Sequence, residues 1–370
     1  MLPTPVDLTL DEIQSHFGTD EKARCYLEEI RWPNGVVCPH CKNADHKRIW
    51  EIKENPEKKI RAGLYHCAEC KKQFTITVGT IFEGSHIPLR KWLVAWYLLC
   101  SSKKGISSLQ IQRMLGLGSY RTALFMTHRI RYALAHPAFS GMLKGVVEVD
   151  ETYVGGKSRG MGRGMHQPNK TCVVSLVERG GNARSLVLDR VTSKNLYGAI
   201  MDHVQDGSTV VTDDFLGYRS MPKIYKHKSV KHCAEEYVRR EKDMDVHTNT
   251  VESKFSLLKR GIVGTFHQIS KKHLPLYLAE FDHRFNHRKD TDGARTVSAL
   301  KCAEGKRLTL KPLKKGDGRS VRLRIWRDAG SLVFVASDEV FRLLETGQKD
   351  VWAIGVPKSD VSSRRNHASK

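Results

Sequence analysis

The spacing of hydrophobic residues changes near residue 141. Before that point, apolar side chains recur at helical intervals and predict an α-helical region. The expected helices cover residues 7–31, 89–100, 106–115 and 119–135. After that point, short runs rich in Val, Ile and Leu predict strands at 146–150, 171–178, 184–191 and 208–212, and another strand-like stretch lies near 226–232. One helix, from Ser193 to His203, separates the third strand from the fourth, and the β-β-β-α-β order predicts a mixed sheet.

Residues that begin and end helices support these boundaries. Thr9 is available as an N-cap for the first helix. Gly116 and Gly118 end the helix over 106–115, and Ser119 caps the next one, which runs to about Ala135. Two helices joined by so short a Gly-containing turn are typical of a helix-turn-helix, although an ordinary helical hairpin has the same spacing.

Basic residues on the second of these helices favour the DNA-binding alternative. A recognition helix carries cationic side chains toward the DNA. The residues expected to contact DNA from this helix are Arg121, Arg129 and Arg131, and His128 lies among them.

Two pairs of cysteines lie upstream of the helical hairpin. Cys38 and Cys41 form one CxxC pair, and Cys67 and Cys70 form a second pair 25 residues later. Four thiolates with this spacing predict one closed, tetrahedral, structural Zn²⁺ site; the alternative is four unrelated free thiols. The run 72–77, rich in aromatic and β-branched residues, predicts a strand of the same ribbon.

Net charge identifies the kind of partner. The chain has 62 Lys and Arg against 40 Asp and Glu, a net charge of +22. Such an excess favours binding to a polyanion such as nucleic acid, with a merely soluble basic protein as the alternative. The longest apolar run, 92–100, is too short to span a bilayer, the first residues do not resemble a signal segment, and the cysteines are paired as metal ligands. We therefore expect a cytoplasmic protein that does not bind membranes.

Acidic residues in three separate places contradict the basic trend. Asp150 and Glu151 follow one predicted strand, Asp213 and Asp214 follow another, and Glu252 lies at the start of an amphipathic helix. Carboxylates are the ligands that Mg²⁺ and Mn²⁺ prefer, and two such ions can clamp the attacking and leaving oxygens of a phosphodiester. These positions predict that the protein cuts or joins nucleic acid.

The helix after residue 250 has two distinct faces. Its predicted buried stripe consists of Val251, Phe255, Leu258 and Ile262. Glu252, Ser256 and Lys259 follow one another on a neighbouring face, and Gly261 and Gly264 interrupt the helix. A solvated salt-bridge face is the alternative to a functional pairing of Glu252 with Lys259.

Two segments outside these elements have less definite patterns. The glycine-rich loop 155–164 contains Lys157, Arg159 and Arg163, which either clamp the DNA backbone or form a solvated hairpin tip. Alternating residues at 321–326 and an apolar run at 331–335 predict a small β-containing appendage. The last dozen residues have the composition of a disordered tail.

Four motifs together resemble a known family. They are Val149-Asp150-Glu151-Thr152-Tyr153-Val154-Gly155-Gly156-Lys157, Thr212-Asp213, Asn249-Thr250-Val251-Glu252 with Lys259-Arg260-Gly261-Ile262, and residues 277–288, YLAEFDHRFNHR. In this order they resemble the DDE transposases of bacterial insertion sequences, and most of all the Merlin-related subgroup, whose members begin with a zinc ribbon. The similarity extends from about Cys38 to Arg288.

The resemblance implies a ribonuclease H-like core in which the strand ending at Asp213 lies beside the strand of Asp150. Asp150, Asp213 and Glu252 would then bind two catalytic Mg²⁺ or Mn²⁺ ions, with Lys259 as their basic partner. Asp213 is chosen over Asp214 because in the family the carboxylate directly follows the Thr. Arg260 is expected to contact DNA, and four further residues are expected to line the site: His247, Asn249, His267 and Arg284.

The implied function is that of a DNA transposase, which binds terminal inverted repeats and catalyses cleavage and strand transfer. Its partner is double-stranded DNA, on which it acts as a homodimer or higher multimer, in association with the bacterial nucleoid. A catalytically inactive DNA-binding regulator and a nuclease on the same fold are the alternatives. The expected domains are the N-terminal helix and zinc ribbon (1–85), the helix-turn-helix (86–140), the catalytic domain (141–290) and a basic appendage (291–370).

Overall fold

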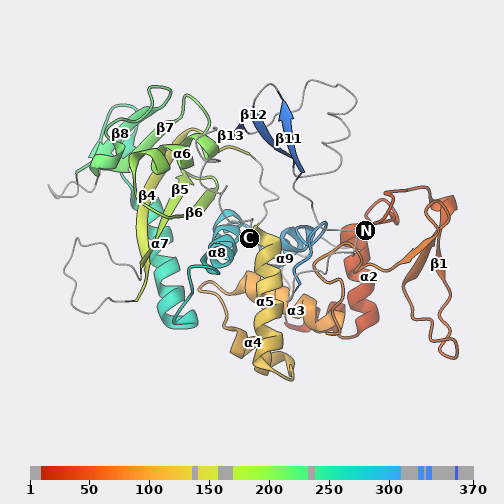
Figure 1. The fold of residues 1–370 in the computed structure, drawn as a ribbon. Helices are drawn as coiled ribbons and strands as arrows, with labels where there is room; N and C mark the ends of the chain where they lie inside the picture. Colours follow the sequence, from red (N-terminus) through yellow and green to blue (C-terminus); the bar gives the residue numbers. More distant parts are fainter. Residues whose placement is uncertain are drawn as a thin grey trace, which may run out of the picture. The chain divides into compact units, whose positions relative to one another are not determined.

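The computed structural model describes residues 10–135, 141–156, 170–231 and 238–309, together with three short strands nearer the C-terminus (Figure 1). The chain divides into two compact units, Met1–Leu308 and Thr309–Lys370. Of the predicted features, the Thr9 cap, the loop residues Lys157, Arg159 and Arg163, and the C-terminal tail lie outside the described residues. No helix in the described part of the chain is long and apolar enough to cross a membrane.

Two helices, and not the single one expected over 7–31, open the described chain. They are α1, Leu10–Phe17, and α2, Asp20–Arg31. The prediction of one continuous helix is wrong because Thr19 has an extended backbone and its side chain accepts a hydrogen bond from the N–H of Lys22, which starts a new helix.

A small antiparallel sheet follows and holds the cysteines. After the 3-10 turn η1 (His46–Arg48), strand β2 (Leu64–Cys67) lies between β1 (Ile49–Ile52) and β3 (Lys72–Phe74). The strand predicted over 72–77 therefore ends at Phe74. The ring of Trp32 packs edge-on against Tyr65 and Phe74, which gives this short segment an aromatic core.

The helical region agrees with the predicted boundaries to within a few residues. Helices α3 (Leu89–Ser101), α4 (Ser108–Leu115) and α5 (Tyr120–Ala135) follow in order. Gly116 ends α4 in the left-handed conformation at φ 56°, and the hydroxyl of Ser119 accepts from the N–H of Thr122 at the start of α5. Helix α9, Asp292–Lys301, packs against α3, so residues 291–308 belong to the first unit although they were predicted to begin the appendage.

A five-stranded mixed sheet forms the centre of the segment after residue 141. Its spatial order is β6-β5-β4-β7-β8. The strands are β4 (Val146–Gly155), β5 (Lys170–Glu178), β6 (Ala183–Leu188), β7 (Thr209–Asp213) and β8 (Lys226–Val230). The first three pair antiparallel, whereas β4–β7 and β7–β8 pair parallel. Helix α6, Ser193–His203, is the crossover that the parallel pairing requires, and its N-cap is Thr192 and not Ser193.

Helices cover both faces of this sheet (Figure 1). Alternate side chains of β5 point to opposite sides, so that Val174 packs with Leu196 and Ile200 of α6. On the other face, Val173 joins the core formed with α7 (Asn249–Gly261) and α8 (Leu274–Asn286). The predicted stripe of α7 is confirmed at Val251, Phe255 and Leu258, which are buried there, with Ile262 partly buried.

Short elements complete the first unit. They are η2 (Leu216–Tyr218), the pair β9 (Arg239–Arg240) and β10 (Asp245–Val246), and the π-helical turn η4 (Ile262–Phe266) that follows α7. The second unit contains an antiparallel sheet of β11 (Arg324–Asp328), β12 (Ser331–Val335) and β13 (Gly355–Val356). The β-containing appendage expected from the sequence is therefore present.

Candidate functional site

The four paired cysteines converge on one point of the N-terminal sheet. Their sulfur atoms all lie within 4.8 Å of one another, and the Sγ–Sγ distances are 3.7 Å for Cys38–Cys70 and 3.6 Å for Cys41–Cys67. A tetrahedral Zn²⁺ with Zn–S bonds of about 2.3 Å separates its sulfur ligands by roughly 3.8 Å. The observed spacing therefore fits a zinc ion.

The backbone around the cysteines is symmetric. The residue after the second cysteine of each pair, Lys42 and Lys71, has a left-handed backbone, with φ of 63° and 56°. This conformation turns the chain sharply enough to bring both sulfurs of one CxxC to the same side. Burial raises the pKa of Cys38 to about 12, whereas at Cys67 the effect of burial is outweighed by hydrogen bonds, first from the backbone of Cys70, that lower its pKa to about 7. A metal ion stabilises all four as thiolates when it binds.

The two predicted strand carboxylates lie on neighbouring parallel strands. The register pairs Val146 with Thr209 and Glu148 with Val211, so Asp150 and Asp213 continue the same alignment two residues later. Asp150 Oδ1 accepts from the N–H of Glu151 at 2.8 Å, and Asp213 Oδ1 accepts from the N–H of Phe215 at 3.1 Å. The predicted adjacency of these two strands is confirmed.

A third carboxylate belongs to this group and was not predicted as a site residue. Glu151 accepts a hydrogen bond from the hydroxyl of buried Tyr218 at 2.7 Å. Burial, followed by the charges of Asp213 and Asp150, raises the pKa of Glu151 to about 7. The sequence signal was present, because Glu151 directly follows Asp150.

The third predicted ligand, Glu252, lies not on the sheet but on helix α7. Its Oε1 accepts from the hydroxyl of Thr248 at 2.8 Å, and its side chain is exposed. Helix α7 packs against β4, the strand of Asp150. Among the described residues, the four cysteines are the one group of three or more potential ligands whose ligand atoms lie close enough together to bind a metal ion. The carboxylates of Asp150, Asp213 and Glu252 lie on adjoining elements, but their oxygen atoms are not as close to one another as those sulfur atoms.

A fully buried carboxylate joins β4 to the N-terminus of α7. Glu148 Oε2 accepts from the N–H groups of Thr250 at 2.8 Å and Val251 at 3.1 Å, and Oε1 accepts from the hydroxyl of Thr250 at 3.0 Å. The side chain of Thr248, the N-cap residue of α7, makes no capping hydrogen bond. Glu148 therefore supplies the cap from another element, and its charge suits the positive end of the helix dipole.

Arg179 completes this connection. Its Nε donates to Glu148 Oε1 at 2.7 Å, and its two Nη atoms donate to the carbonyls of Asp245 at 2.6 Å and His247 at 2.8 Å. One guanidinium thus fixes the chain entering α7 and neutralises the buried carboxylate. His247, which we expected to line the site, instead lies 3.2 Å from Glu148 through its Nδ1.

The inner face of α7 is anchored by a polar network. Buried Lys254 lies 2.7 Å from Asp282 of α8 and donates to Ser175 and Ser185 of the sheet. Asp282 in turn accepts from the N–H of Ser185 at 2.6 Å and from its hydroxyl at 2.8 Å. The helix is thereby held on both β5 and β6.

Two basic residues near the end of α7, Lys259 and Arg260, lie on its solvent-exposed side. Glu252, two turns before Lys259, is exposed as well. Arg260 donates to Ser256 at 2.7 Å. Asp214, the residue rejected as a ligand, is also exposed.

Two of the three arginines expected to contact DNA from α5 are buried, which corrects their assignment. Arg131 has no exposed surface; its guanidinium pairs with Glu280 of α8 and stacks over Tyr277 at 4.0 Å. Arg129 stacks over Trp92 at 5.2 Å and donates to the carbonyl of Glu83. Both stabilise packing, and Arg121 alone of the three is exposed.

The remaining expected site residues are dispersed. Asn249 begins α7, and His267 lies exposed beyond its end with φ 60°. Arg284 is buried and paired with Glu280, as is Arg131, so one carboxylate serves two guanidinium groups. Arg284 therefore does not lie beside the strand carboxylates but contributes to the α5–α8 contact.

Comparison with known proteins agrees with these two centres. Residues 142–286 match the family described as ISXO2-like transposase domain, and residues 18–73 match the transposase zinc-ribbon domain. A relative from Halobacterium salinarum, described as an uncharacterized protein in transposable element ISH50, is 31% identical over 291 residues. The alignment covers 72% of this chain and 91% of that protein.

Proposed function

The chain belongs to the ISXO2-like DDE transposases of insertion sequences, and we propose that it cuts and joins DNA at a centre formed by Asp150, Asp213 and Glu252. The observation that supports this proposal is the parallel pairing of β4 with β7, whose register ends at Glu148 and Val211, two residues before Asp150 and Asp213. We infer that the catalytic core is ribonuclease H-like, and the strand order β6-β5-β4-β7-β8 with α6 as crossover supports this inference.

The donor set fits hard divalent cations. Carboxylate oxygens on two strands and one helix supply the ligands that Mg²⁺ or Mn²⁺ prefers, in a chain of net charge +22 that otherwise disfavours cations. Two ions bound there would supply activation of the attacking water and stabilisation of the leaving 3′-oxygen. The protein contributes the rigid spacing of the ligands, because Glu148 and Arg179 fix α7 against β4.

The exposed side of α7 is suited to hold the DNA. Lys259 lies on the same side of the helix as Glu252, where its ammonium would contact a phosphate near the cut, and Arg260 would contact the backbone alongside it. A freed 3′-hydroxyl held in the same position would then attack target DNA, so the two chemical steps need no second centre.

Recognition of the DNA ends falls to the N-terminal elements. The zinc ribbon and the α4–α5 pair precede the catalytic sheet, and we assign them, with exposed Arg121, to binding the terminal inverted repeats. Pairing of two ends in one complex calls for a homodimer or higher multimer. The loop residues Lys157, Arg159 and Arg163 remain a proposed clamp on the DNA backbone.

A strand-transfer assay tests the proposal. Purified protein is incubated with Mg²⁺ or Mn²⁺ and a DNA carrying the flanking ends of the element, and we expect cleavage at the end and joining to target DNA. Binding of the ends without cleavage would instead identify a DNA-binding regulator. Cleavage without joining would identify a nuclease on the same fold.

A further inference from the structure

A cavity of about 330 Å³ lies on the flank of α7 away from Glu252. It is lined by Lys254 and Leu257 of α7, by Phe281, Arg284 and Phe285 of α8, by Arg288 beyond the end of α8, by Arg295 of α9, and by Ser101 and Lys103. Its volume is at the lower end of the range for small-molecule pockets and suits a ligand the size of one nucleotide.

Every charged group in the lining of this cavity is cationic: Lys103, Lys254, Arg284, Arg288 and Arg295. Ion pairs offset part of the charge, joining Lys254 to Asp282, Arg295 to Asp292 and Arg284 to Glu280. Glu280 is shared with Arg131, so this carboxylate leaves one positive charge unbalanced. In the part of the chain that the structure describes, Lys103 and Arg288 have no carboxylate partner.

Arg284 adds an observation independent of the charge count. It is buried, and its Nε and one Nη have no hydrogen-bond partner among the described residues. Buried N–H groups without an acceptor are costly, and an anion in the adjacent cavity would satisfy them after a small side-chain shift. The third nitrogen is already used, by Glu280 and by the carbonyl of Leu99.

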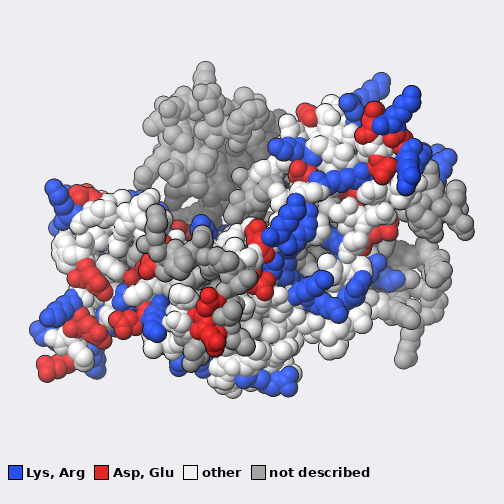
Figure 2. All heavy atoms as spheres, turned by 180° about the vertical axis from the view of Figure 1, so that it is seen from behind, with Lys and Arg blue, Asp and Glu red and all other residues white. Residues whose placement is uncertain are grey.

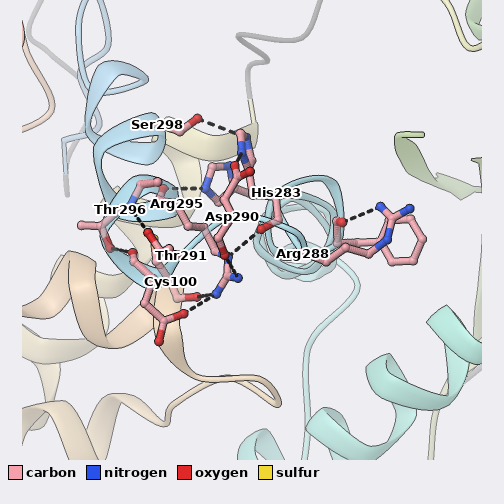
Figure 3. Close-up of polar contacts among 12 residues, drawn as sticks. Cys100, His283, Arg288, Asp290, Thr291, Arg295, Thr296 and Ser298 are labelled. Atoms are coloured by element: carbon pink, nitrogen blue, oxygen red, sulfur yellow. Dashed lines mark hydrogen bonds and ion pairs between the residues drawn. The ribbon is translucent and has the colours of Figure 1, made fainter. Parts of the chain in front are cut away.

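The walls offer stacking surfaces as well as charge. Arg284 lies over the ring of Phe281 at 4.5 Å, and Arg288 lies over Phe285 at 4.2 Å. Each guanidinium is therefore close to an aromatic ring, and the exposed Arg288 can receive a nucleobase on its other side. Arg288 also donates to the backbone carbonyl of Phe285 at 2.9 Å (Figure 3).

Arg295 makes the rear wall rigid. Its guanidinium donates to the carbonyls of Cys100 at 3.1 Å, His287 at 3.1 Å and Asp290 at 3.0 Å, and Figure 3 shows it at the centre of these contacts. The ends of α3 and α8 are thus fixed together before any ligand arrives. Lys103 and Arg288 are exposed at the edge, where a strand can reach them.

We propose that this cavity binds one nucleotide of a DNA strand, its phosphate near Lys103, Arg284 and Arg288 and its base against the guanidinium of Arg288. The inference rests on the proposed function for the identity of the polyanion, but the cavity lies on a different side of α7 from the catalytic carboxylates. On the face drawn in Figure 2, Lys and Arg side chains are numerous and Asp and Glu side chains lie among them.

The test measures binding of a fluorescein-labelled 12-nucleotide single strand to the full-length, zinc-loaded protein without added Mg²⁺ or Mn²⁺. The variant Lys103→Gln/Arg288→Gln removes the two edge charges, and the matched control Lys289→Gln/Lys301→Gln removes two exposed charges that do not line the cavity. We expect the cavity variant to bind about tenfold more weakly, with a salt slope lower by about 1.4, and the control to change less than about twofold. Equal losses in the two variants would overturn the proposal.

A second measurement locates the nucleotide. A strand containing 5-iodouridine is irradiated on the protein, and peptide mapping should place the cross-link within residues 281–288 or 101–103. Cross-links confined to other segments would contradict the assignment. If thymidine 5′-monophosphate binds wild type but not the cavity variant while binding of the strand is equal in both, the cavity takes a free nucleotide and the DNA assignment fails.

The outcomes separate this proposal from the catalytic one. The binding assay does not depend on DNA cleavage. Loss of strand binding in the cavity variant would therefore support the nucleotide site even if the protein proves to be a catalytically inactive regulator. Conversely, normal strand binding by the cavity variant together with metal-dependent cleavage by wild type would leave the catalytic centre intact and remove only the nucleotide site.

Discussion

Glu148 and Thr250 are joined by two hydrogen bonds between a strand and a helix, at 2.8 Å from the Thr N–H and 3.0 Å from its hydroxyl. Each residue lies two positions before a proposed metal ligand, Glu148 before Asp150 and Thr250 before Glu252. The contact therefore fixes the distance between the two ligands, although neither partner is itself a ligand. Five predictions follow from this and the other contacts of the site.

Replacement of Glu148 by Gln should destabilise the protein by about 3 kcal/mol, because it leaves Arg179 without its charged partner and weakens the cap of α7. Urea unfolding measures the change, and strand transfer should fall with it. Glu178→Gln on the adjacent strand is the control and should change stability by less than about 0.5 kcal/mol. An unchanged unfolding midpoint in Glu148→Gln would show that the helix does not depend on this cap.

The three proposed metal ligands should act as one unit. Asp150→Asn, Asp213→Asn and Glu252→Gln should each abolish cleavage and strand transfer while binding of the DNA ends persists. Double variants should be little worse than single ones. Asp214→Asn is the internal control and should keep most activity; if it is inactive while Asp213→Asn is active, the wrong carboxylate has been chosen.

Metal analysis should find about one zinc per chain, held by the four converging thiols. Cys67→Ser should lower the zinc content and weaken end binding, because the small sheet has few other sources of stability. Exposed Cys25, which lies outside the cluster, provides the control Cys25→Ser. Full zinc retention in Cys38→Ser/Cys67→Ser would disprove the site.

Arg121 and Arg131 should behave differently although they share α5. Arg121→Gln should weaken end binding and lower the salt slope by about 0.9, the effect of one phosphate contact, with the fold unchanged. Arg131→Gln should lower the free energy of unfolding by about 2 kcal/mol, because it removes the contact with the Tyr277 ring and one charged hydrogen bond to Glu280, which keeps Arg284 as its partner. The two are compared by DNA titration and urea unfolding, and equal stability of both variants would refute the burial of Arg131.

The stability of the metal-free protein should fall between about pH 4.5 and pH 7 because of Glu151. Its pKa is raised on folding from 4.5 to about 7, so over this interval the unfolded chain has lost a proton that the folded chain retains. Protonated Glu151 contributes fully to the free energy of unfolding below pH 4.5, and this contribution is lost as the pH rises to about 7. Glu151→Gln should remove this part of the slope, measured by urea unfolding without added divalent metal. Identical slopes in the two proteins would contradict it.

Local sequence patterns predicted the positions of helices and strands well, but they did not predict which distant residues contact one another. Local sequence patterns located the five strands of the mixed sheet, and the CxxC spacing located the cysteine cluster, because both depend on residues close in sequence. Glu148 was missed because its partners lie about 100 residues away. Its signal was a carboxylate inside a buried apolar run, at Val146-Val147-Glu148-Val149, which demands a partner.

The arginines of α5 show the opposite failure. A basic side chain on a helix was taken as a DNA contact, but Arg131 follows Ala123 and Thr127 at intervals of four on the buried stripe. Arg131 is a packing residue because it lies on the buried side of α5, although its residue type is typical of a DNA contact. The break at Thr19 was overlooked for a similar reason, since an apolar spacing that spans two helices resembles one.

The Arg131–Glu280–Arg284 contact has a consequence for how such transposases can be recombined. Helix α5 belongs to the N-terminal half and α8 to the catalytic half, and their charged contact is buried, so that loss of Glu280 would leave two buried guanidinium groups without a carboxylate. A chimera that takes residues 10–135 from one relative and 141–309 from another will fold well only if both parents carry a compatible triad. An exchange of the two halves between relatives should therefore keep Arg131, Glu280 and Arg284 together.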